Sequence, residues 1–148
     1  MYTFFKRTAP PPQMSTFDAP SREACTVRRE RTNTPLQALL LLNDPQYFEA
    51  ARALAGRVLR EAGGSPEERA AYMFELATCR PPNDLERDEL VGLWLDQQSH
   101  FQAQSAEAAQ VAGAMDDVLV IETNAADVAA WTVVANLVLN LDEVITKN

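Results

Sequence analysis

The chain has 148 residues, of which 47% are hydrophobic and 23% are charged, and its formal net charge at pH 7 is −8. This size and composition are typical of one globular domain with a single core, and they exclude a disordered chain. The acidic charge argues against nucleic-acid binding, and no uncharged apolar run reaches the roughly 18 residues of a membrane span.

The charge is unevenly distributed along the chain. Residues 1–35 carry six basic and three acidic side chains, a net charge of +3, whereas residues 36–148 carry seven basic and eighteen acidic ones, a net charge of −11. A basic segment beside an acidic body either docks within the molecule or faces an anionic partner. The sequence favours intramolecular docking and leaves the second alternative open.

The first 33 residues are predicted to form an extended arm. Residues 1–9 are rich in aromatic side chains and are expected to pack on the body as a short strand or helical turn. Pro10–Pro12 favour an extended stretch because each proline fixes φ and lacks an N–H group. Residues 13–33 show no sustained periodicity, and a loop of this length in a compact domain tends to be functional.

Helix start signals divide the rest of the chain. Each is a capping residue, in most cases followed by proline: Thr34-Pro35, Asp44-Pro45, Ser65-Pro66 and either Asn83 or Asp84. With the apolar periodicity that follows them, these signals predict helices over residues 35–43, 45–61, 66–80, 84–101 and, more weakly, 105–112.

The last third of the chain contains an ambiguous run and a strongly apolar helix. Residues 118–121 are β-branched and apolar, but they have no partner strand, so an extended connector is expected over 114–122. Asn124 opens a final helix over about 125–142, and its apolar residues cover more than one face. Such a helix is normally buried, which places it at the centre of the bundle.

These elements predict an all-α fold with one helical domain over residues 1–148. The body, residues 34–148, is expected to be a compact bundle of five to six helices. An extended, Pro/Arg-rich N-terminal arm, residues 1–33, is expected to pack on it.

The arm carries most of the unusual chemistry of the chain. The candidate binding residues are Asp18, Arg22, Cys25, Arg28, Arg31 and Asn33. Guanidinium groups on one loop bind carboxylate, sulfate or phosphate groups, and a thiol among them favours its reactive thiolate form. The alternative, which the sequence favours, is that acidic neighbours pair with the arginines and pin the loop, with Cys25 as a small buried residue. No catalytic residue is assigned, because the single histidine, His100, is remote from Cys25 in the sequence.

The two cysteines, Cys25 and Cys79, leave two states open. A disulfide between them would stabilise the fold by about 4 kcal/mol in the chain-entropy model, and it would require an oxidising compartment. Two separate buried thiols are the alternative. No CxxC motif is present and there is one histidine, so we expect no metal site and no haem attachment in this chain.

Some polar and aromatic residues are assigned structural roles. Asn136 and Asn140 lie one helical turn apart and are expected to satisfy buried backbone groups, such as those of the loop at 32–34. Trp94 and Trp131 occupy core positions of their helices. We expect them to pack in the core and not to form a sugar-stacking platform.

Four stretches together resemble a domain of unknown function found in planctomycetes. They are YTFFKRTAPPP (2–12), TFDAPSREACTVRRERTNTPLQALLLLNDPQYFEAARALA (16–55), RPP (80–82) and AAWTVVANLVLNLDEVITK (129–147). That domain forms the C-terminal part of large secreted proteins, many of which also carry a cytochrome c-like domain. The resemblance implies that the chain is the C-terminal portion of a longer exported protein, periplasmic or extracellular, whose haem belongs to another domain.

The resemblance and the residues together predict a non-catalytic helical module that serves domain docking or assembly. Its expected partners are other domains of the parent protein and, as an open alternative, an anionic ligand or a glycan. A second interpretation is that the loop at 18–33 contributes to a periplasmic enzyme or to an anion- or glycan-binding module. An open cleft lined by Asp18, Cys25 and Arg28 would favour that second interpretation.

Overall fold

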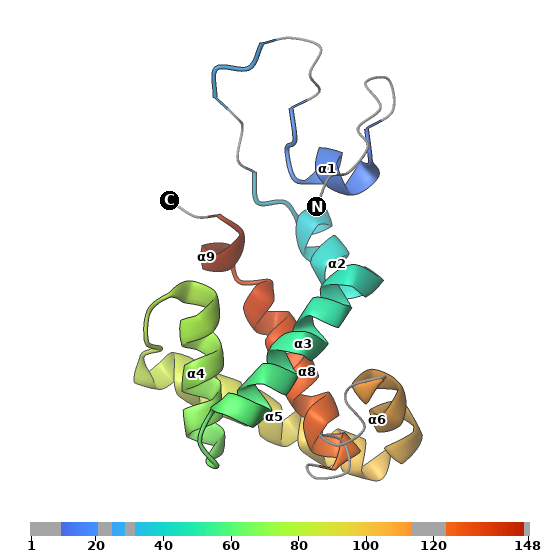
Figure 1. Cartoon of the computed structure of the whole chain (residues 1–148), viewed down its shortest axis with the longest axis vertical. Helices are drawn as coiled ribbons and strands as arrows, with labels where there is room; N and C mark the ends of the chain where they lie inside the picture. Colours follow the sequence, from blue (N-terminus) through green and yellow to red (C-terminus); the bar gives the residue numbers. More distant parts are fainter. Residues whose placement is uncertain (1–9, 21–24, 29–31, 114–123, 147–148) are drawn as a thin grey trace.

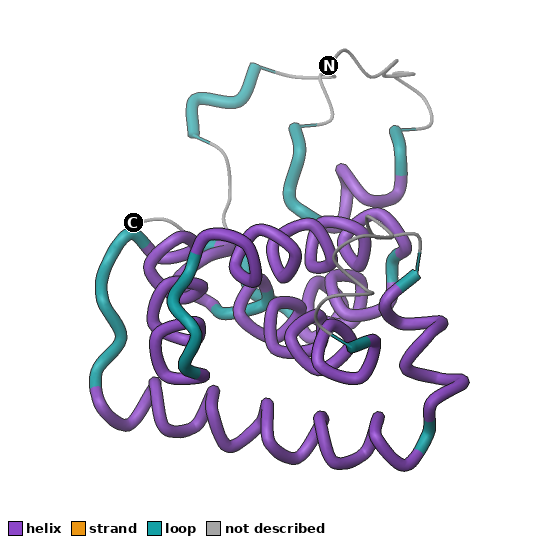
Figure 2. Tube along the Cα trace, turned by 60° about the horizontal axis from the view of Figure 1, so that its bottom comes forward, coloured by secondary structure: helices purple, strands orange, loops and turns teal. Residues whose placement is uncertain are grey.

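The structure is a computed structural model that describes residues 10–20, 25–28, 32–113 and 124–146. Within these ranges it contains helices and loops and no strand (Figure 2). The helices are α1 (Pro12–Thr16), α2 (Pro35–Asn43), α3 (Pro45–Glu61), α4 (Pro66–Thr78), α5 (Asp84–Ala103), α6 (Ser105–Ala112), α8 (Ala125–Leu139) and α9 (Asp142–Ile145). The predicted all-α fold is therefore confirmed.

Capping residues set the helix boundaries as the sequence predicts. At the start of α2 the Thr34 side chain accepts a hydrogen bond from the Gln37 N–H group, and the Gln37 side chain accepts one from the Thr34 N–H group. The same reciprocal pair opens α4 and α5, with the pairs Ser65–Glu68 and Asn83–Glu86. Each pair satisfies backbone donors that a helix start leaves without partners.

Two predicted elements differ from the structure. The prolines do not all stay extended, because Pro12 begins α1; proline suits this first helical position, where its missing N–H group has no intrahelical partner. The last helix ends at Leu139 and not near residue 142. Leu141 is extended (φ −65°, ψ 141°), and its conformation separates α8 from the short α9.

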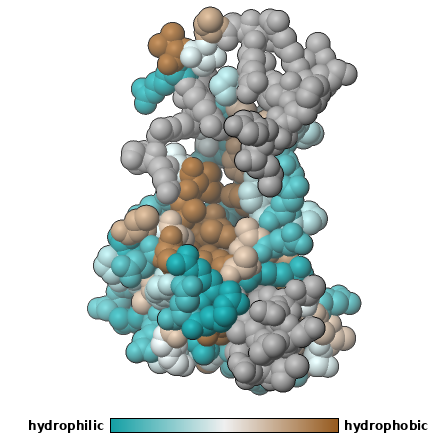
Figure 3. Space-filling model, in the orientation of Figure 1, coloured by the Kyte–Doolittle hydropathy of each residue, from teal (hydrophilic) through white to brown (hydrophobic). Residues whose placement is uncertain are grey.

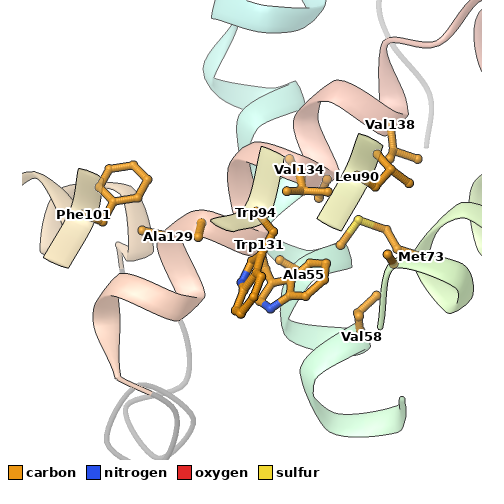
Figure 4. Close-up of a cluster of buried hydrophobic side chains, with 14 of the residues drawn as sticks. Ala55, Val58, Met73, Leu90, Trp94, Phe101, Ala129, Trp131, Val134 and Val138 are labelled. Atoms are coloured by element: carbon orange, nitrogen blue, oxygen red, sulfur yellow. The ribbon is translucent and has the colours of Figure 1, made fainter. Parts of the chain in front are cut away.

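Helix α8 lies at the centre of the bundle, with α3, α4, α5 and α6 packed around it (Figure 1). Figure 4 shows side chains of α3, α4 and α5 converging on Trp131, Val134 and Val138 of α8. The Trp131 ring stacks on Trp94 with the ring centroids 5.6 Å apart. The prediction that the all-round apolar helix is buried is confirmed, since ten of its residues are buried.

The arm packs on the body at its two ends. Near its start, the Phe17 ring lies edge-on to Tyr47 at 6.0 Å between centroids, and Gln13 donates a hydrogen bond to Asp44 (2.7 Å). In contrast, residues 25–28 are exposed and lie away from the helices in Figure 1. The prediction of a packed arm is therefore wrong for this tip, whose four described residues are exposed. The predicted strand or turn at 1–9 and the connector at 114–122 lie outside the described residues.

Candidate functional site

The candidate loop begins and ends at a hydrogen-bonded cluster around Gln37, whose side chain is buried. Gln37 Nε2 donates to the Thr16 carbonyl oxygen (2.7 Å) and to Thr32 Oγ1 (3.0 Å), and its Oε1 accepts from the Thr34 N–H group (2.9 Å). Asp18 Oδ2 accepts from the Thr32 N–H group (2.8 Å) and from Thr32 Oγ1 (2.7 Å). We call these five residues the loop base; they hold the two ends of the loop together.

Two of the predicted binding residues thus have architectural partners. Asp18 belongs to the loop base, and its backbone is in the left-handed region (φ 57°), which aspartate tolerates better than most residues. The Asn33 side chain donates a hydrogen bond to Asp142 in α9 (2.5 Å). Both side chains therefore connect the arm to the helical body.

The tip of the loop faces solvent. Cys25, Val27 and Arg28 are exposed, and Val27 is fully so. Among the residues that the structure describes, Arg28 forms no ion pair. Arg22 and Arg31 lie outside the described residues. Of the other candidates, Asp18 lies in the loop base, Asn33 binds Asp142 of α9, and Cys25 and Arg28 lie at the tip.

Neither expected state of the cysteines is present. Cys25 and Cys79 are both free and both exposed, so the structure has no disulfide between them and they are not buried thiols. The reason is their placement: Cys25 is at the solvent-facing tip, whereas Cys79 directly follows α4 and ends it in a left-handed conformation (φ 62°).

Arg80, in the RPP turn, joins three helices that lie apart in the sequence. Its guanidinium group donates to Glu86 at the start of α5 (2.6 Å) and to Glu143 in α9 (2.9 Å), and it lies 4.7 Å from the centre of the Phe74 ring of α4. Hydrogen bonds from Arg80, and then from the Asn83 N–H group, lower the pKa of Glu86 to about 2. The turn was recognised in the sequence, but its carboxylate partners come from α5 and α9.

Asp127 in the first turn of α8 forms a second such junction. Its carboxylate accepts from Trp94 Nε1 of α5 (2.9 Å) and from Arg69 Nη1 of α4 (3.3 Å). A carboxylate is also favourable there because the helix N-terminus carries partial positive charge. Trp94 and Trp131 are 8% and 0% exposed, so the predicted core packing is confirmed and these rings offer no sugar-stacking platform.

The amides of Asn136 in α8 and of Asn140, which directly follows α8, bind backbone groups as predicted, but on a different element. Asn136 donates to the Leu42 carbonyl oxygen and Asn140 to the Ala38 carbonyl oxygen, each at 3.4 Å. Both acceptors belong to α2 and not to the loop at 32–34. The amides therefore hold α2 against α8.

The opposite side of α2 is apolar and exposed, which sequence reasoning missed. Leu36, Leu39 and Leu42 are 61%, 58% and 43% exposed, and we call them the leucine face. Leu137 of α8, next to Asn136, is also 43% exposed. Figure 3 shows apolar residues gathered on the visible surface where Figure 1 places the end of α8 between α2 and α9. The run of leucines was visible in the sequence, but their exposure depends on what packs against them.

Within the described ranges, no group of three or more His, Cys, Asp or Glu side chains is arranged to hold a metal ion. In the same ranges, no helix is both long and apolar enough to cross a membrane.

Comparison with known proteins identifies a family but no activity. Neither a curated protein nor a solved structure matches the chain. The model of one family, PSD1, matches residues 1–94, which include α1 to α4 and the first half of α5. The resembling stretch at 129–147 lies beyond the matched range. Since the match spans more than half of the sequence, the chain belongs to the PSD1 family, described as a protein of unknown function (DUF1553).

Proposed function

We propose that the chain is a non-catalytic helical module that serves docking or assembly within a larger protein. The observation that carries this proposal is the leucine face, an apolar surface on a helix that has no charged residue. Exposed apolar patches of this kind are typical of protein interaction sites.

Three arginines of the helical body bind groups on other helices, which supports a structural role for the module. Arg52 donates to the carbonyl oxygens of Val111 and Gln110 at the end of α6, at 2.7 and 3.0 Å. Arg69 pairs with Asp127, and Arg80 pairs with two carboxylates. These guanidinium groups hold helices together and are not free to bind a ligand.

The separation of the reactive side chains also supports a non-catalytic role. His100 lies near the end of α5 beside Glu107 of α6 (3.3 Å). Cys25 is at the loop tip and Cys79 follows α4. A nucleophile and its base must lie within hydrogen-bonding distance, and the contacts of these three residues provide no such pair.

The sequence resemblance supports the wider context of the proposal. On that basis the parent is a planctomycete protein that is exported to the periplasm or the cell exterior and carries a cytochrome c-like domain. The haem is held by that other domain, and the neighbouring domains are the partners of this module.

An immunoblot with an antibody against this chain tests the proposal in the source organism. We expect a polypeptide clearly larger than this chain, found in the exported fraction and positive in a haem peroxidase stain. A reactive band of this chain's own size in the cytoplasmic fraction would contradict the proposal.

A second candidate function is anion binding at the loop tip, and the exposed guanidinium side chain of Arg28 favours it. Guanidinium groups bind sulfate and carboxylate groups in pairs of hydrogen bonds. Calorimetric titration with heparin oligosaccharide tests this function. Binding weakened about tenfold by Arg28→Ala and unchanged by Arg60→Ala would support it, whereas equal effects of the two substitutions would reject it.

A further inference from the structure

We propose that the leucine face binds an amphipathic segment of a partner protein in which apolar side chains are flanked by lysine or arginine. This inference rests on the proposed docking function and specifies the surface and the chemistry of the partner. The five leucines of α2 lie all around the helix. A helix that is apolar on all sides is normally buried, yet only Gln37 and Leu41 are buried in α2.

The face is preformed, because α2 is held at both ends and along its inner side. The capping box at Thr34 fixes its start, and Asp44 ends it while capping α3. Asn136 of α8 and Asn140, the residue that follows α8, donate hydrogen bonds to two of its carbonyl oxygens. The exposure of the leucines is therefore a property of the packed fold and does not arise from fraying of α2.

The spacing of the face suits a short partner segment. Leu36, Leu39 and Leu42 recur every three residues, so they span about 9 Å along the helix axis at about 1.5 Å per residue. Apolar side chains at such spacing are the usual anchors when a helix packs against an apolar surface. Two turns of an amphipathic helix match this length.

The surrounding charge specifies a basic partner. Asp142 lies near the start of α2, through its hydrogen bond to Asn33, and Asp44 lies at its end. The helices α1, α2 and α9 contain no Lys, Arg or His. The whole chain carries thirteen basic and twenty-one acidic side chains, a net charge of −8. A second copy of the chain or an anionic lipid surface would be repelled, whereas a basic segment would be attracted.

A fluorescent 18-residue amphipathic peptide of leucine and lysine serves as the probe, and a leucine–glutamate peptide of the same pattern is its counterpart. The test variant of the chain is Leu36→Ser/Leu39→Ser. The matched control is Leu85→Ser/Leu95→Ser on α5, which also replaces two exposed leucines (70% and 49% exposed). Circular dichroism of each variant checks that the helices are retained, and the single substitution Leu39→Gln replaces the pair if they are not.

Fluorescence anisotropy should show saturable binding of the lysine peptide to the unmodified chain, weaker at high salt. We expect the α2 variant to weaken binding at least tenfold and the α5 control to change it less than twofold. The glutamate peptide should bind at least tenfold more weakly than the lysine peptide. Equal losses in both variants, or equal binding of both peptides, would overturn the inference.

Two further measurements distinguish the other occupants. Sedimentation that reveals a dimer lost in the α2 variant would identify a second copy as the occupant and overturn the inference. Binding of the chain to phosphatidylglycerol vesicles that is lost in the same variant would identify a lipid surface as the occupant and would also overturn the inference. The immunoblot of the parent protein is independent of all these readouts, so failure of this inference and failure of the proposed function can be told apart.

Discussion

The buried amide of Gln37 joins the arm to the helical body. Its side chain contacts Thr16 and Thr32 of the arm and Thr34 at the start of α2. A buried polar group contributes stability when its hydrogen bonds are complete, and its removal leaves the partner groups without bonds. The sequence indicated Thr34 as a cap, but nothing in its pattern indicated that Gln37 also binds the beginning of the loop.

We predict that Gln37→Leu lowers the free energy of unfolding by about 1–3 kcal/mol, because it leaves the Thr16 carbonyl and the Thr34 N–H group without this partner. Urea unfolding followed by circular dichroism measures the change. Gln46→Leu, at an exposed position of α3, is the matched control and should change the free energy by less than about 0.5 kcal/mol. Equal effects of the two substitutions would contradict the role of Gln37.

The ion pairs of Arg80 make stability depend on pH in acid. The pKa of Glu86 is lowered to about 2 in the folded protein, against an ordinary value of 4.5. A carboxyl group with a lowered folded pKa binds its proton more readily in the unfolded state, so its stabilising effect is complete above pH 4.5 and is lost towards pH 2.

Replacing Glu86 with Gln should therefore reduce the fall in Tm between about pH 5 and pH 2, and lower Tm at neutral pH. Thermal melts across this range measure the effect. Glu89→Gln, an exposed residue of the same helix, is expected to leave the profile unchanged. A Glu86→Gln profile identical to that of the unmodified chain would show that the pair contributes nothing.

The number of reactive thiols in the folded protein can be measured directly, because both cysteines are exposed. Because Cys25 and Cys79 are free and accessible, the folded protein should react with two equivalents of a thiol reagent without reductant. Titration with Ellman's reagent under native conditions measures this. Fewer than two reactive thiols in the unfolded, unreduced protein would instead favour the disulfide.

At the scale of elements, α6 shows how a weak helix is stabilised by its neighbours. Its cap residue Gln104 makes no capping hydrogen bond from its side chain, and the helix is only eight residues long. Arg52 of α3 donates to the carbonyl oxygens of Val111 and Gln110, and Gly113 follows with φ 61°. The φ of Gly113 favours glycine, and a Cβ atom there would lie 2.8 Å from Arg52 Cζ, so a side chain at this position would displace the Arg52 guanidinium group.

We predict that Arg52→Ala destabilises the fold by about 1–2 kcal/mol and speeds amide exchange most strongly in α6, where the helix end loses its donors. Hydrogen exchange with mass spectrometry locates the effect. Arg60→Ala, an exposed position on the same helix, is the control. Faster exchange spread evenly over the chain would show that Arg52 does not act on α6 specifically.

Across the whole molecule, the core is completed by a helix that lies outside the matched range of the family. The match to the PSD1 family ends at residue 94 of this chain, whereas α8 begins at Ala125. Yet α3, α4 and α5 all pack on α8, which contributes Trp131, Val134 and Val138 to the core. In this chain the matched residues therefore depend on the C-terminal region for burial of their apolar surfaces.

A fragment of residues 1–94 should consequently fail to fold cooperatively. Without α8, the apolar sides of α3 and α4 would remain in water, and burial of such surface is the main driving force of folding. We expect residual helical circular dichroism, strong binding of the dye ANS and no sigmoidal urea transition. Cooperative unfolding of the fragment, with the full chain as reference, would show that the matched region is autonomous.

The fold class and most helix boundaries could be predicted from the sequence, because they depend on local chemistry. A capping side chain, a proline at the first helical position and apolar periodicity act within a few residues of each other. They predicted the limits of α2 and α3 and the buried character of α8. In the candidate site, local chemistry identified the loop but not the partners of its residues.

Which of these residues meet depends on how the helices pack, and this could not be predicted from the sequence. The bonds from Gln37 to Thr16, from Asn33 to Asp142 and from Arg80 to Glu143 join positions that are far apart in the chain. The exposure of Cys25 and of the leucine face likewise depends on what the rest of the fold leaves uncovered. Such contacts arise from the packing of whole helices, and no local pattern of residues encodes them.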